Sequence, residues 1–520
     1  MKKMMKMIAK RVKIFAVVAA TALATTSCLD KMPGSAIPVD EAMKSYEEAD
    51  QIVTGIYGLM KSSALWSGLI TLLPDIQADL VYAVDGYTNT YGQHWQWDIR
   101  STNSEIEAVY ASLYGVIAQC NFFLERVDEV IRLQTDDDRI TALEQYTGEV
   151  YTIRALCYSE LLKLYCEAYD PARATEQLGV VLRKGFSMEE PAVRASLYDS
   201  YEFVVKDLER AEEILDKDYD QYSSYYMTNG VAHALHARVA LYMQDWESAI
   251  EHSTAVIDHP NGVYALSAAN VAYTADMSYF DYMWNYDLAT EVLWEIGFTP
   301  TSYGGALGQV FLNFTTDYYY YYPDYVPAQW VLDLYSSGDL RYNSYFATLT
   351  TGHTHGLTWP LLVKYYGNQQ NFIPNMIYHV NMPKPFRLAE QYLIRAEALC
   401  RKESPDFANA SKDISALRQT RLASGGSLSL TADNYIQQIA DERVRELYME
   451  GHRLIDLKRW GKLYNNGEGF KRTPQLNSLA EGSSLEVKAD HPLFVWPIPQ
   501  HEIEAPGSQV APNESNKISD

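Results

Sequence analysis

Residues 441–460 read DERVRELYMEGHRLIDLKRW, and charged side chains recur through this stretch at short, regular intervals. Glu442, Glu446 and Glu450 follow one another every four residues, the spacing that places side chains on one face of a helix. Arginines are interleaved with these glutamates: Arg443, Arg445 and Arg453. We therefore predict a helix here whose carboxylates are held in a network of ion pairs.

The same glutamates allow a second interpretation, a carbohydrate-active enzyme in which Glu446 and Glu450 are acid and base. Glycosidases hold two carboxyl groups about 5 to 9.5 Å apart on opposite sides of a substrate cleft. Neighbouring residues on one helix can satisfy the distance, but they do not lie across a cleft from each other. Adjacent arginines keep carboxylates ionised instead of raising one pKa. The chain also contains no Walker loop, nucleophile elbow or HExxH sequence. We predict that the protein is not an enzyme and needs no cofactor.

Residues 441–460 closely resemble the carboxy-terminal signature of the SusD/RagB family. The signature runs Glu-Arg, Glu, Glu-Gly-x-Arg, Asp-Leu and Arg-Trp, and it matches at Glu442-Arg443, Glu446, Glu450-Gly451-His452-Arg453, Asp456-Leu457 and Arg459-Trp460. Residues 388–398 resemble the preceding helix of the family, and residues 496–499, Trp-Pro-Ile-Pro, resemble its closing segment. Residues 165–167 depart from the family, which commonly has an aromatic-Gly turn there, so only the local loop is in question.

The resemblance implies a mostly α fold in which tetratricopeptide-like helical hairpins support a loop-rich ligand-binding half. It also implies a lipoprotein at the cell surface of the outer membrane. Such proteins capture glycans, or peptides in some members, for a SusC-like TonB-dependent transporter. The signature belongs to the scaffold of the family, so the resemblance does not identify any binding residue in this chain.

The first residues have the pattern of a lipoprotein signal. Basic residues precede an apolar run at 14–24, which is too short to be a permanent membrane span, and Cys28 follows small residues. We predict a signal peptide at 1–27, lipidation at Cys28 and contact with the membrane through the lipid anchor only. An ordinary secretory signal with an incidental cysteine is the alternative.

The remaining chain, 28–520, is predicted to be a single domain. Helical periodicity places a scaffold at about 40–260 and 386–465, with helices at 46–60, 105–131, 141–165, 229–243, 247–257, 386–401 and 406–421. Glycines and prolines interrupt residues 261–385, which we expect to be an aromatic-rich irregular insertion. The segment 466–520 is also expected to be irregular, with a disordered tail.

Composition narrows the possible partners. The net charge is -24, which repels phosphate backbones, so we predict no nucleic-acid partner. Four cysteines follow Cys28 without a CxxC pair and are predicted to be buried free thiols: Cys120, Cys157, Cys166 and Cys400. The 41 tyrosines and 10 tryptophans are flat, amphipathic side chains that suit both mixed cores and sugar-contacting surfaces.

Two aromatic regions are candidates for ligand binding. The loop around Asp79, Trp95 and Trp97 combines rings that could stack on sugars with carboxylates that could bind hydroxyls. Tyr303, beside two glycines, and Tyr318, in a run of five tyrosines, form the second region. The alternative for each ring is that it packs a loop onto the helices. Neither region identifies a particular glycan or peptide.

Histidines supply the remaining candidates. His353 and His355 could share a metal in an extended loop, although a third ligand is not apparent nearby. His233 and His236 lie three apart in an alanine-rich helix, which favours packing. We therefore predict no metal site. A repeat protein that only docks other surface proteins is a third functional hypothesis, which the abundant tyrosines disfavour.

Overall fold

The computed structural model describes residues 42–84, 88–186, 191–317, 319–352, 358–474 and 480–518. These residues form a mostly helical fold, as predicted, and their short strands pair two by two. None of the helices in these ranges is long and apolar enough to cross a bilayer. The predicted signal peptide and Cys28 lie outside the described residues.

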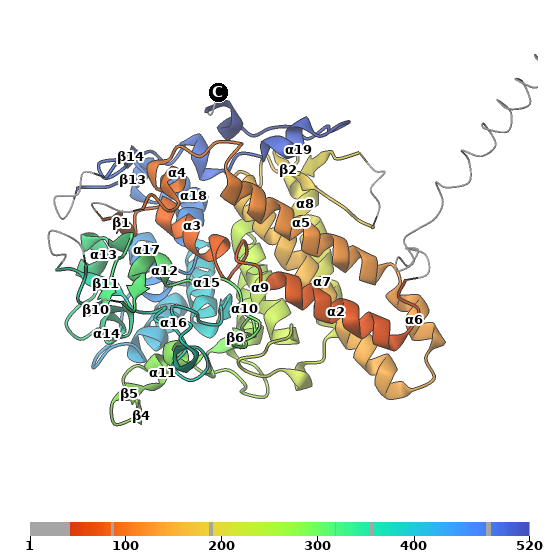
Figure 1. The fold of residues 1–520 in the computed structure, drawn as a ribbon, viewed down its shortest axis with the longest axis horizontal. Helices are drawn as coiled ribbons and strands as arrows, with labels where there is room; N and C mark the ends of the chain where they lie inside the picture. The colour runs from red at the N-terminus through yellow and green to blue at the C-terminus, as the bar shows by residue number, and fades with distance from the viewer. Residues whose placement is uncertain are drawn as a thin grey trace, which may run out of the picture.

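Long helices form one side of the molecule, drawn from red to yellow-green in Figure 1. The helices of this amino-terminal half are α2 (Tyr46–Met60), α3 (Leu69–Gln77), α4 (Gly92–Gln96), α5 (Ser104–Leu124), α6 (Val127–Leu133), α7 (Asp137–Tyr165), α8 (Leu197–Ile214), α9 (Asn229–Met243) and α10 (Trp246–Ile257). The helices after the irregular segment are α15 (Leu388–Arg401), α16 (Phe407–Gln419), α17 (Tyr435–Glu446), α18 (Arg453–Trp460) and α19 (Gln500–Glu504).

Helices adjacent in sequence pack as pairs, α7 with α8, α9 with α10 and α15 with α16. The predicted turn between α9 and α10 is present: Gln244 adopts a left-handed conformation (φ 62°), and the Asp245 side chain caps α10 by accepting from the amide of Ser248. Small residues allow the close approach, because Ala234, Ala237 and Ala249 are fully buried. The helical hairpins that the resemblance implies are therefore present, with the helices predicted at 229–243 and 247–257 forming one pair and those at 386–401 and 406–421 another.

An arginine near the middle of α7, α9 and α15 pairs with a carboxylate on another helix. Each ion pair either holds the two helices of one hairpin together or joins one hairpin to the next. One guanidinium per site donates two hydrogen bonds to one carboxylate on another helix, at nitrogen–oxygen distances of 2.6 to 2.9 Å. The pairs are Arg154 with Asp207, Arg238 with Glu390, and Arg395 with Asp413. Bidentate pairing of this kind fixes orientation as well as distance. The three arginines lie in similar sequences, Ile153-Arg154-Ala155, Ala237-Arg238-Val239 and Ile394-Arg395-Ala396, which therefore mark equivalent contacts of the scaffold.

The segment between α10 and α15 contains only short elements, and in Figure 1 they lie opposite the long helices. Its helices are α11 (Tyr279–Tyr286), α12 (Gln309–Leu312), α13 (Gln329–Asp333) and α14 (Arg341–Tyr345). The antiparallel strand pairs along the chain are β1 (Val81–Ala83) with β9 (Tyr325–Pro327), β2 (Leu178–Val181) with β3 (Arg194–Ser196), β4 (Ala272–Thr274) with β5 (Met277–Ser278), β6 (Val292–Trp294) with β12 (Phe386–Arg387), β7 (Phe314–Thr315) with β8 (Tyr320–Tyr321), β10 (Phe346–Thr348) with β11 (Pro360–Leu362), and β13 (Phe470–Lys471) with β14 (Glu486–Val487).

The signature stretch is two helices and not one. Helix α17 ends at Glu446 and α18 begins at Arg453, because Met449 (φ 59°) and Gly451 (φ 84°) turn the chain between them. A Cβ on Gly451 would lie 2.7 Å from the carbonyl oxygen of Ile70, so glycine is required by space as well as by conformation. The single helix predicted over these residues is therefore wrong at its centre.

Two other predictions can be compared with the structure. Cys120, Cys157, Cys166 and Cys400 are buried and free, as predicted.

The tail is ordered to residue 518, contrary to our prediction, since the Asn516 side chain exchanges two hydrogen bonds with the backbone of Ile498. Asn513 also donates to the carbonyl oxygens of Tyr165 and Trp496. The last segment therefore closes the helical core.

Candidate ligand-binding site

Trp95 and Trp97 are both in the core, which corrects their prediction as stacking platforms. Trp95 has no exposed surface; Arg472 covers its ring face at 3.4 Å, and its indole N–H donates to the carbonyl of Glu481. Trp97 is 6% exposed and donates to the carbonyl of Gln77 at 2.6 Å. Neither ring presents a face to a surface ligand.

Asp79 also has a structural partner. Its two carboxylate oxygens accept from the guanidinium of Arg453, each at 2.9 Å, and the residue is 8% exposed. A carboxylate held by a buried bidentate arginine is not available to sugar hydroxyls. Asp79, Trp95 and Trp97 are therefore part of the packed core, and Asp79 joins its segment to the signature through Arg453.

The signature glutamates form a buried ion-pair network, as predicted, but mostly with arginines from other segments. Glu446 pairs with Arg341, Arg387 and Arg421 at 2.9 to 3.0 Å. Burial opposes ionisation, yet these arginines lower the pKa of Glu446 to about 2, and arginine and lysine lower the pKa of Glu450 as well. Two fully ionised, paired carboxylates cannot supply the proton donor that glycosidic cleavage needs.

Tyr303 and Tyr318 belong to the second predicted region. Tyr303 is 44% exposed, and its ring packs edge-on against buried Phe372 with a centroid distance of 5.9 Å. Tyr318 lies outside the described residues. The side chains on both sides of it can be described, and several of them pack against aromatic rings of neighbouring segments.

This group, which we name the tyrosine surface, comprises Tyr303, Phe314, Tyr319, Tyr320, Tyr321, Tyr366 and Tyr378. Phe314 is its centre, with ring centroids 5.0 Å from Tyr321, 5.3 Å from Tyr378 and 6.3 Å from Tyr319. Tyr319 is 76% exposed and Tyr320 is 39% exposed. Phe314 therefore supports the exposed ring of Tyr319 at the solvent.

The β7–β8 hairpin and a buried histidine position these rings. His379 accepts a hydrogen bond from the Phe314 amide through Nε2 (3.1 Å), and its carbonyl accepts from the Gly308 amide. Burial lowers the pKa of His379 to about 4, so the ring is neutral and able to accept at neutral pH. The Tyr321 and Tyr366 hydroxyls also bond each other at 2.9 Å.

Glycines bring the other end of the surface against the helical half. A Cβ on Gly304 would lie 2.1 Å from the carbonyl oxygen of Lys61, directly after α2, and the Gly305 amide donates to the Ser67 hydroxyl at 3.0 Å. The chain can approach this closely only without side chains. Tyr303 is thereby fixed to the scaffold instead of being carried on an independent loop.

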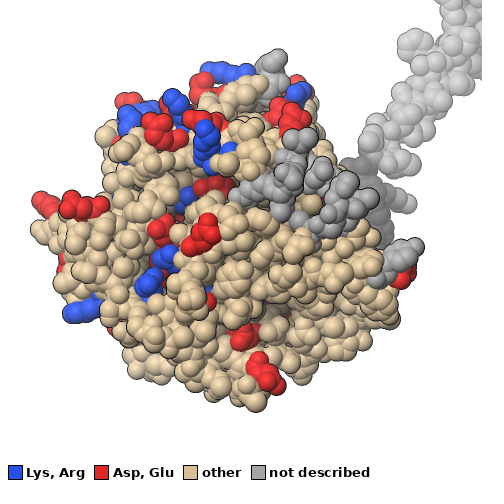
Figure 2. Space-filling view, turned by 90° about the vertical axis from the view of Figure 1, so that its left-hand side faces the viewer, with Lys and Arg blue, Asp and Glu red and all other residues tan. Residues whose placement is uncertain are grey.

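The segments that carry the tyrosine surface are nearly uncharged. Residues 299–323 and 365–380 contain only one acidic residue, Asp317, and no lysine or arginine. Their polar side chains are mostly amides and hydroxyls, including exposed Gln309, Gln370 and Asn375. Figure 2 shows that the side of the molecule with α13, α14, β10 and β11 likewise has broad areas without charged side chains. Flat rings with neutral amides are the groups that bind neutral sugars.

Two further features are alternatives to this surface. Tyr282 and Tyr286 of α11 stack with ring centroids 4.7 Å apart, Tyr273 packs at a tilt against Tyr282 at 4.3 Å, and the carbonyl of Asn285 accepts from the amide of Gln369. A cavity of about 300 Å³ also lies beside α5, lined by Tyr110 and Tyr114 among others. The Tyr114 hydroxyl is already bonded to the backbone of Val181. This hydroxyl therefore already has partners within the fold.

Sequence reasoning missed Phe314, Tyr366 and Tyr378 as members of the site. Tyr366 and Tyr378 lie more than forty residues from the tyrosine run, and they meet the group through the Tyr321 hydroxyl and the Phe314 ring. The signal that could have found them is the lack of charge shared by 299–323 and 365–380. His233 and His236, predicted to pack, instead meet a glutamate and a third histidine.

Comparisons with known proteins agree with this architecture. A family model described as "SusD family" matches residues 290–511, and one described as "Starch-binding associating with outer membrane" matches residues 28–241. A SusD-like protein P25 from Formosa agariphila is 22% identical over 486 residues, which cover 84% of this chain and 86% of the relative.

Solved structures share the fold across nearly the whole chain. A SusD superfamily protein from Bacteroides thetaiotaomicron superposes with a TM-score of 0.76 and 22% identity, covering 90% of this chain and 99% of the other. Surface glycan-binding protein A from Bacteroides fluxus has a TM-score of 0.70 and 18% identity, with coverage of 90% and 99%. At these identities the likeness establishes the fold, and the binding site must be argued from this chain's own residues.

Proposed function

Because the chain belongs to the SusD family, we propose that it binds an oligo- or polysaccharide at the tyrosine surface and passes it to a SusC-like outer-membrane transporter. The observation that carries this proposal is the union of exposed, fixed tyrosine rings with segments that hold one charged carboxylate. Aromatic faces stack on the C–H faces of sugars, while amides bond hydroxyl groups.

Binding in this proposal involves no chemical step. Tyr319, Tyr320 and Tyr303 would contact sugar rings, and Gln309, Gln370 and Asn375 would donate to or accept from hydroxyl groups. The buried members of the surface supply rigidity, which reduces the entropy that binding must overcome. The chain would therefore contribute capture and orientation, and translocation would be the work of the transporter.

Calorimetry tests the ligand class directly. The mature protein is titrated with starch, laminarin and xylan oligosaccharides and with a mixture of neutral peptides. We expect saturable binding to at least one glycan. Binding to peptides alone would replace the carbohydrate proposal with a peptide-binding one, and release of shortened oligosaccharides on incubation would contradict the absence of catalysis.

Variants place the site. Tyr303→Ala and Tyr319→Ala should each weaken glycan binding by about tenfold, since one aromatic contact contributes on the order of 1 kcal/mol. Tyr219→Ala is the matched control, because Tyr219 is 63% exposed but lies between α8 and α9. Unchanged affinity in both surface variants would move the site elsewhere, with the Tyr273 cluster as the next candidate.

We further propose that Cys28 anchors the protein to the outer membrane through lipid. A Cys28→Ala variant should leave the membrane fraction for the soluble fraction while keeping glycan affinity. Co-purification of the wild-type protein with a TonB-dependent transporter tests the partner. Retention of the variant in the membrane fraction, with no labelling of the wild type by fatty acid, would contradict the anchor.

A further inference from the structure

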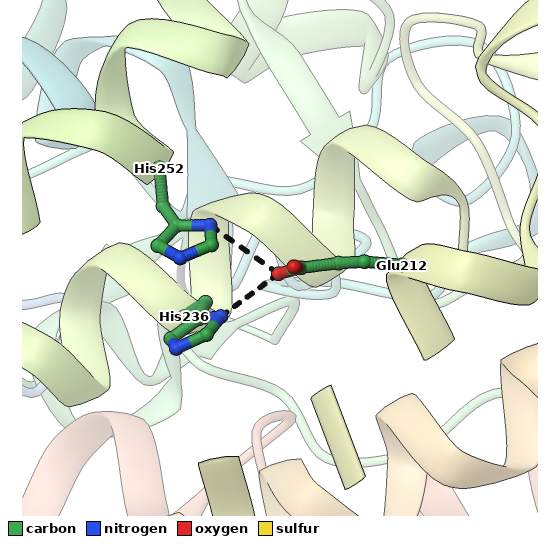
Figure 3. A group of neighbouring side chains, drawn as sticks. All are labelled: Glu212, His236 and His252. Carbon is green, nitrogen blue, oxygen red and sulfur yellow. Dashed lines mark hydrogen bonds and ion pairs between the residues drawn. The ribbon is translucent and has the colours of Figure 1, made fainter. Parts of the chain in front are cut away.

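Three helices of the scaffold bring histidines and a glutamate together outside the proposed ligand-binding site. Glu212 comes from α8, His233 and His236 from α9, and His252 from α10. Figure 3 shows His236 and His252 directed toward the same end of Glu212. Ligand atoms of Glu212, His236 and His252 all lie within 4.8 Å of one another.

The Nδ1 atoms of three histidines approach one carboxylate oxygen, Oε1 of Glu212. The distances are 2.9 Å from His236, 3.3 Å from His233 and 3.4 Å from His252. Ligand atoms in a tetrahedral zinc site lie about 3.4 Å apart when each metal–ligand distance is about 2.1 Å. The ligand atoms of Glu212, His236 and His252 therefore lie close to the separations that a common metal ion would require.

The protonation states also suit a metal. Burial and the neighbouring His236 lower the pKa of His252 to about 4, so this ring is neutral at pH 7. Burial opposes ionisation of Glu212, but hydrogen bonds from His233 and His236 outweigh it and lower its pKa to about 2. Neutral imidazole and ionised carboxylate are the forms that ligate metals.

The surroundings provide both access and a favourable field. A cavity of about 400 Å³ adjoins the cluster, and four further acidic side chains line it: Glu202, Glu209, Asp245 and Glu251. Among the residues that the structure describes, no lysine or arginine lines this cavity. Acidic walls around an accessible cavity concentrate cations near the histidines.

We propose that Glu212, His236 and His252 bind one divalent transition-metal ion and leave a fourth coordination position open. Two imidazoles and one carboxylate are a ligand set for Zn²⁺ and not for Ca²⁺ or Mg²⁺, which take mainly oxygen ligands. The ion would tie α8, α9 and α10 together. His236 and His252 stack at a centroid distance of 3.6 Å, so their rings must rotate for both to point at the metal.

The experiment uses mature protein without a histidine tag, treated with chelator and then dialysed. Titration with Zn²⁺ alone should give one saturable site, and thermal unfolding should shift upward by about 2 to 5 °C at saturating Zn²⁺. Co²⁺ should produce the intense visible bands of a tetrahedral complex. Only the weak bands of aqueous Co²⁺, together with no saturable Zn²⁺ binding, would overturn the proposal and leave a hydrogen-bonded cluster.

Variants identify the ligands. His252→Asn and Glu212→Gln should each weaken Zn²⁺ binding by at least about tenfold and abolish the thermal shift. His501→Asn is the matched control, because His501 is exposed on α19, and it should bind Zn²⁺ as the wild type does. Far-ultraviolet circular dichroism establishes that each variant is folded. Wild-type affinity in both folded ligand variants would also overturn the site.

Discussion

Tyr319 combines a highly exposed ring with an unfavourable backbone conformation. It lies in the β7–β8 turn at φ 57° and is 76% exposed. Most residues other than glycine lose about 1 kcal/mol in the left-handed region, whereas asparagine adopts that region more readily because its short side chain can form local hydrogen bonds. The cost suggests that the ring is retained for its surface and not for stability.

We therefore expect Tyr319→Asn to separate stability from binding. The free energy of unfolding should stay unchanged or rise by up to about 1 kcal/mol, while glycan affinity falls by about tenfold. Urea denaturation and calorimetry measure the two quantities on one preparation. Tyr219→Asn should leave affinity unchanged, and a Tyr319→Asn protein with full affinity would remove this ring from the site.

Glu446 has the opposite role, because it stabilises the scaffold and is fully buried. Glu446→Gln leaves Arg387 and Arg421 without part of their partner, and breaking a buried pair costs about 3 to 5 kcal/mol. A carboxyl group whose pKa is lowered by folding stabilises the protein above its unfolded pKa, and this stability is lost as pH falls through the folded pKa.

The stability difference between wild type and Glu446→Gln should therefore depend on pH. Since the pKa of Glu446 is lowered from 4.5 to about 2, the difference should be constant above pH 5 and shrink by about 3 kcal/mol between pH 4.5 and pH 2. Urea unfolding followed by tryptophan fluorescence at several pH values measures it. Glu403→Gln, at an exposed position, is the control. A pH-independent difference would argue against an ionised Glu446.

The predictions for single residues were least accurate for aromatic rings, which can either pack in the core or bind a ligand at the surface. Trp95 and Tyr303 cannot be told apart from composition alone, since both lie in aromatic loops. Whether each ring is buried depends on a residue far away in the sequence. Arg472 covers Trp95, whereas Tyr303 has Phe372 on one side and solvent on the other. The glycines beside Tyr303 were visible in the sequence, but the depth at which Trp95 is buried was not.

Elements with a strong helical period were predicted closely. The predicted bounds 46–60 and 229–243 coincide with α2 and α9. Helix α8 was missed, although its buried residues repeat at intervals of four and three: Leu197, Tyr201, Val204, Leu208 and Ala211. The short strands could not be predicted, because each is two to four residues long and depends on a partner from another segment.

The turn between α17 and α18 gives a prediction at this scale. Gly451→Ala should lower the free energy of unfolding by about 2 to 4 kcal/mol, because alanine is strained at φ 84° and its Cβ would meet the backbone of Ile70. Chemical denaturation of the two proteins measures the loss.

Gly115→Ala is the matched control for that substitution. Gly115 lies on the exposed side of α5, and a Cβ there would meet nothing within 4 Å. It should raise the free energy of unfolding by about 0.5 to 1 kcal/mol, because alanine favours helix. Equal effects of the two substitutions would mean that Gly451 is not conformationally required.

At the scale of the whole molecule, the charged residues are concentrated in the scaffold and are nearly absent from the segments of the tyrosine surface. The chain carries a net charge of -24, yet the segments of the tyrosine surface hold one charged residue between them. The paired arginines and glutamates are concentrated in the buried scaffold, where they fix the helices and the signature turn. An uncharged site on an acidic protein favours ligands without charge, because an anion would be repelled and a cation would be held elsewhere.

This separation predicts how binding responds to salt. Raising NaCl from about 0.05 to 0.5 M shortens the screening length from about 14 to 4 Å, but stacking and hydrogen bonds to a neutral sugar involve no charge to screen. Glycan affinity should therefore change by less than about twofold across this range, measured by calorimetry on the wild-type protein. A tenfold loss would show that the ligand is charged and that Asp317 or the surrounding acidic surface takes part in binding it. The Asp317→Asn variant distinguishes these two, because it removes the only acidic group from the segments of the tyrosine surface.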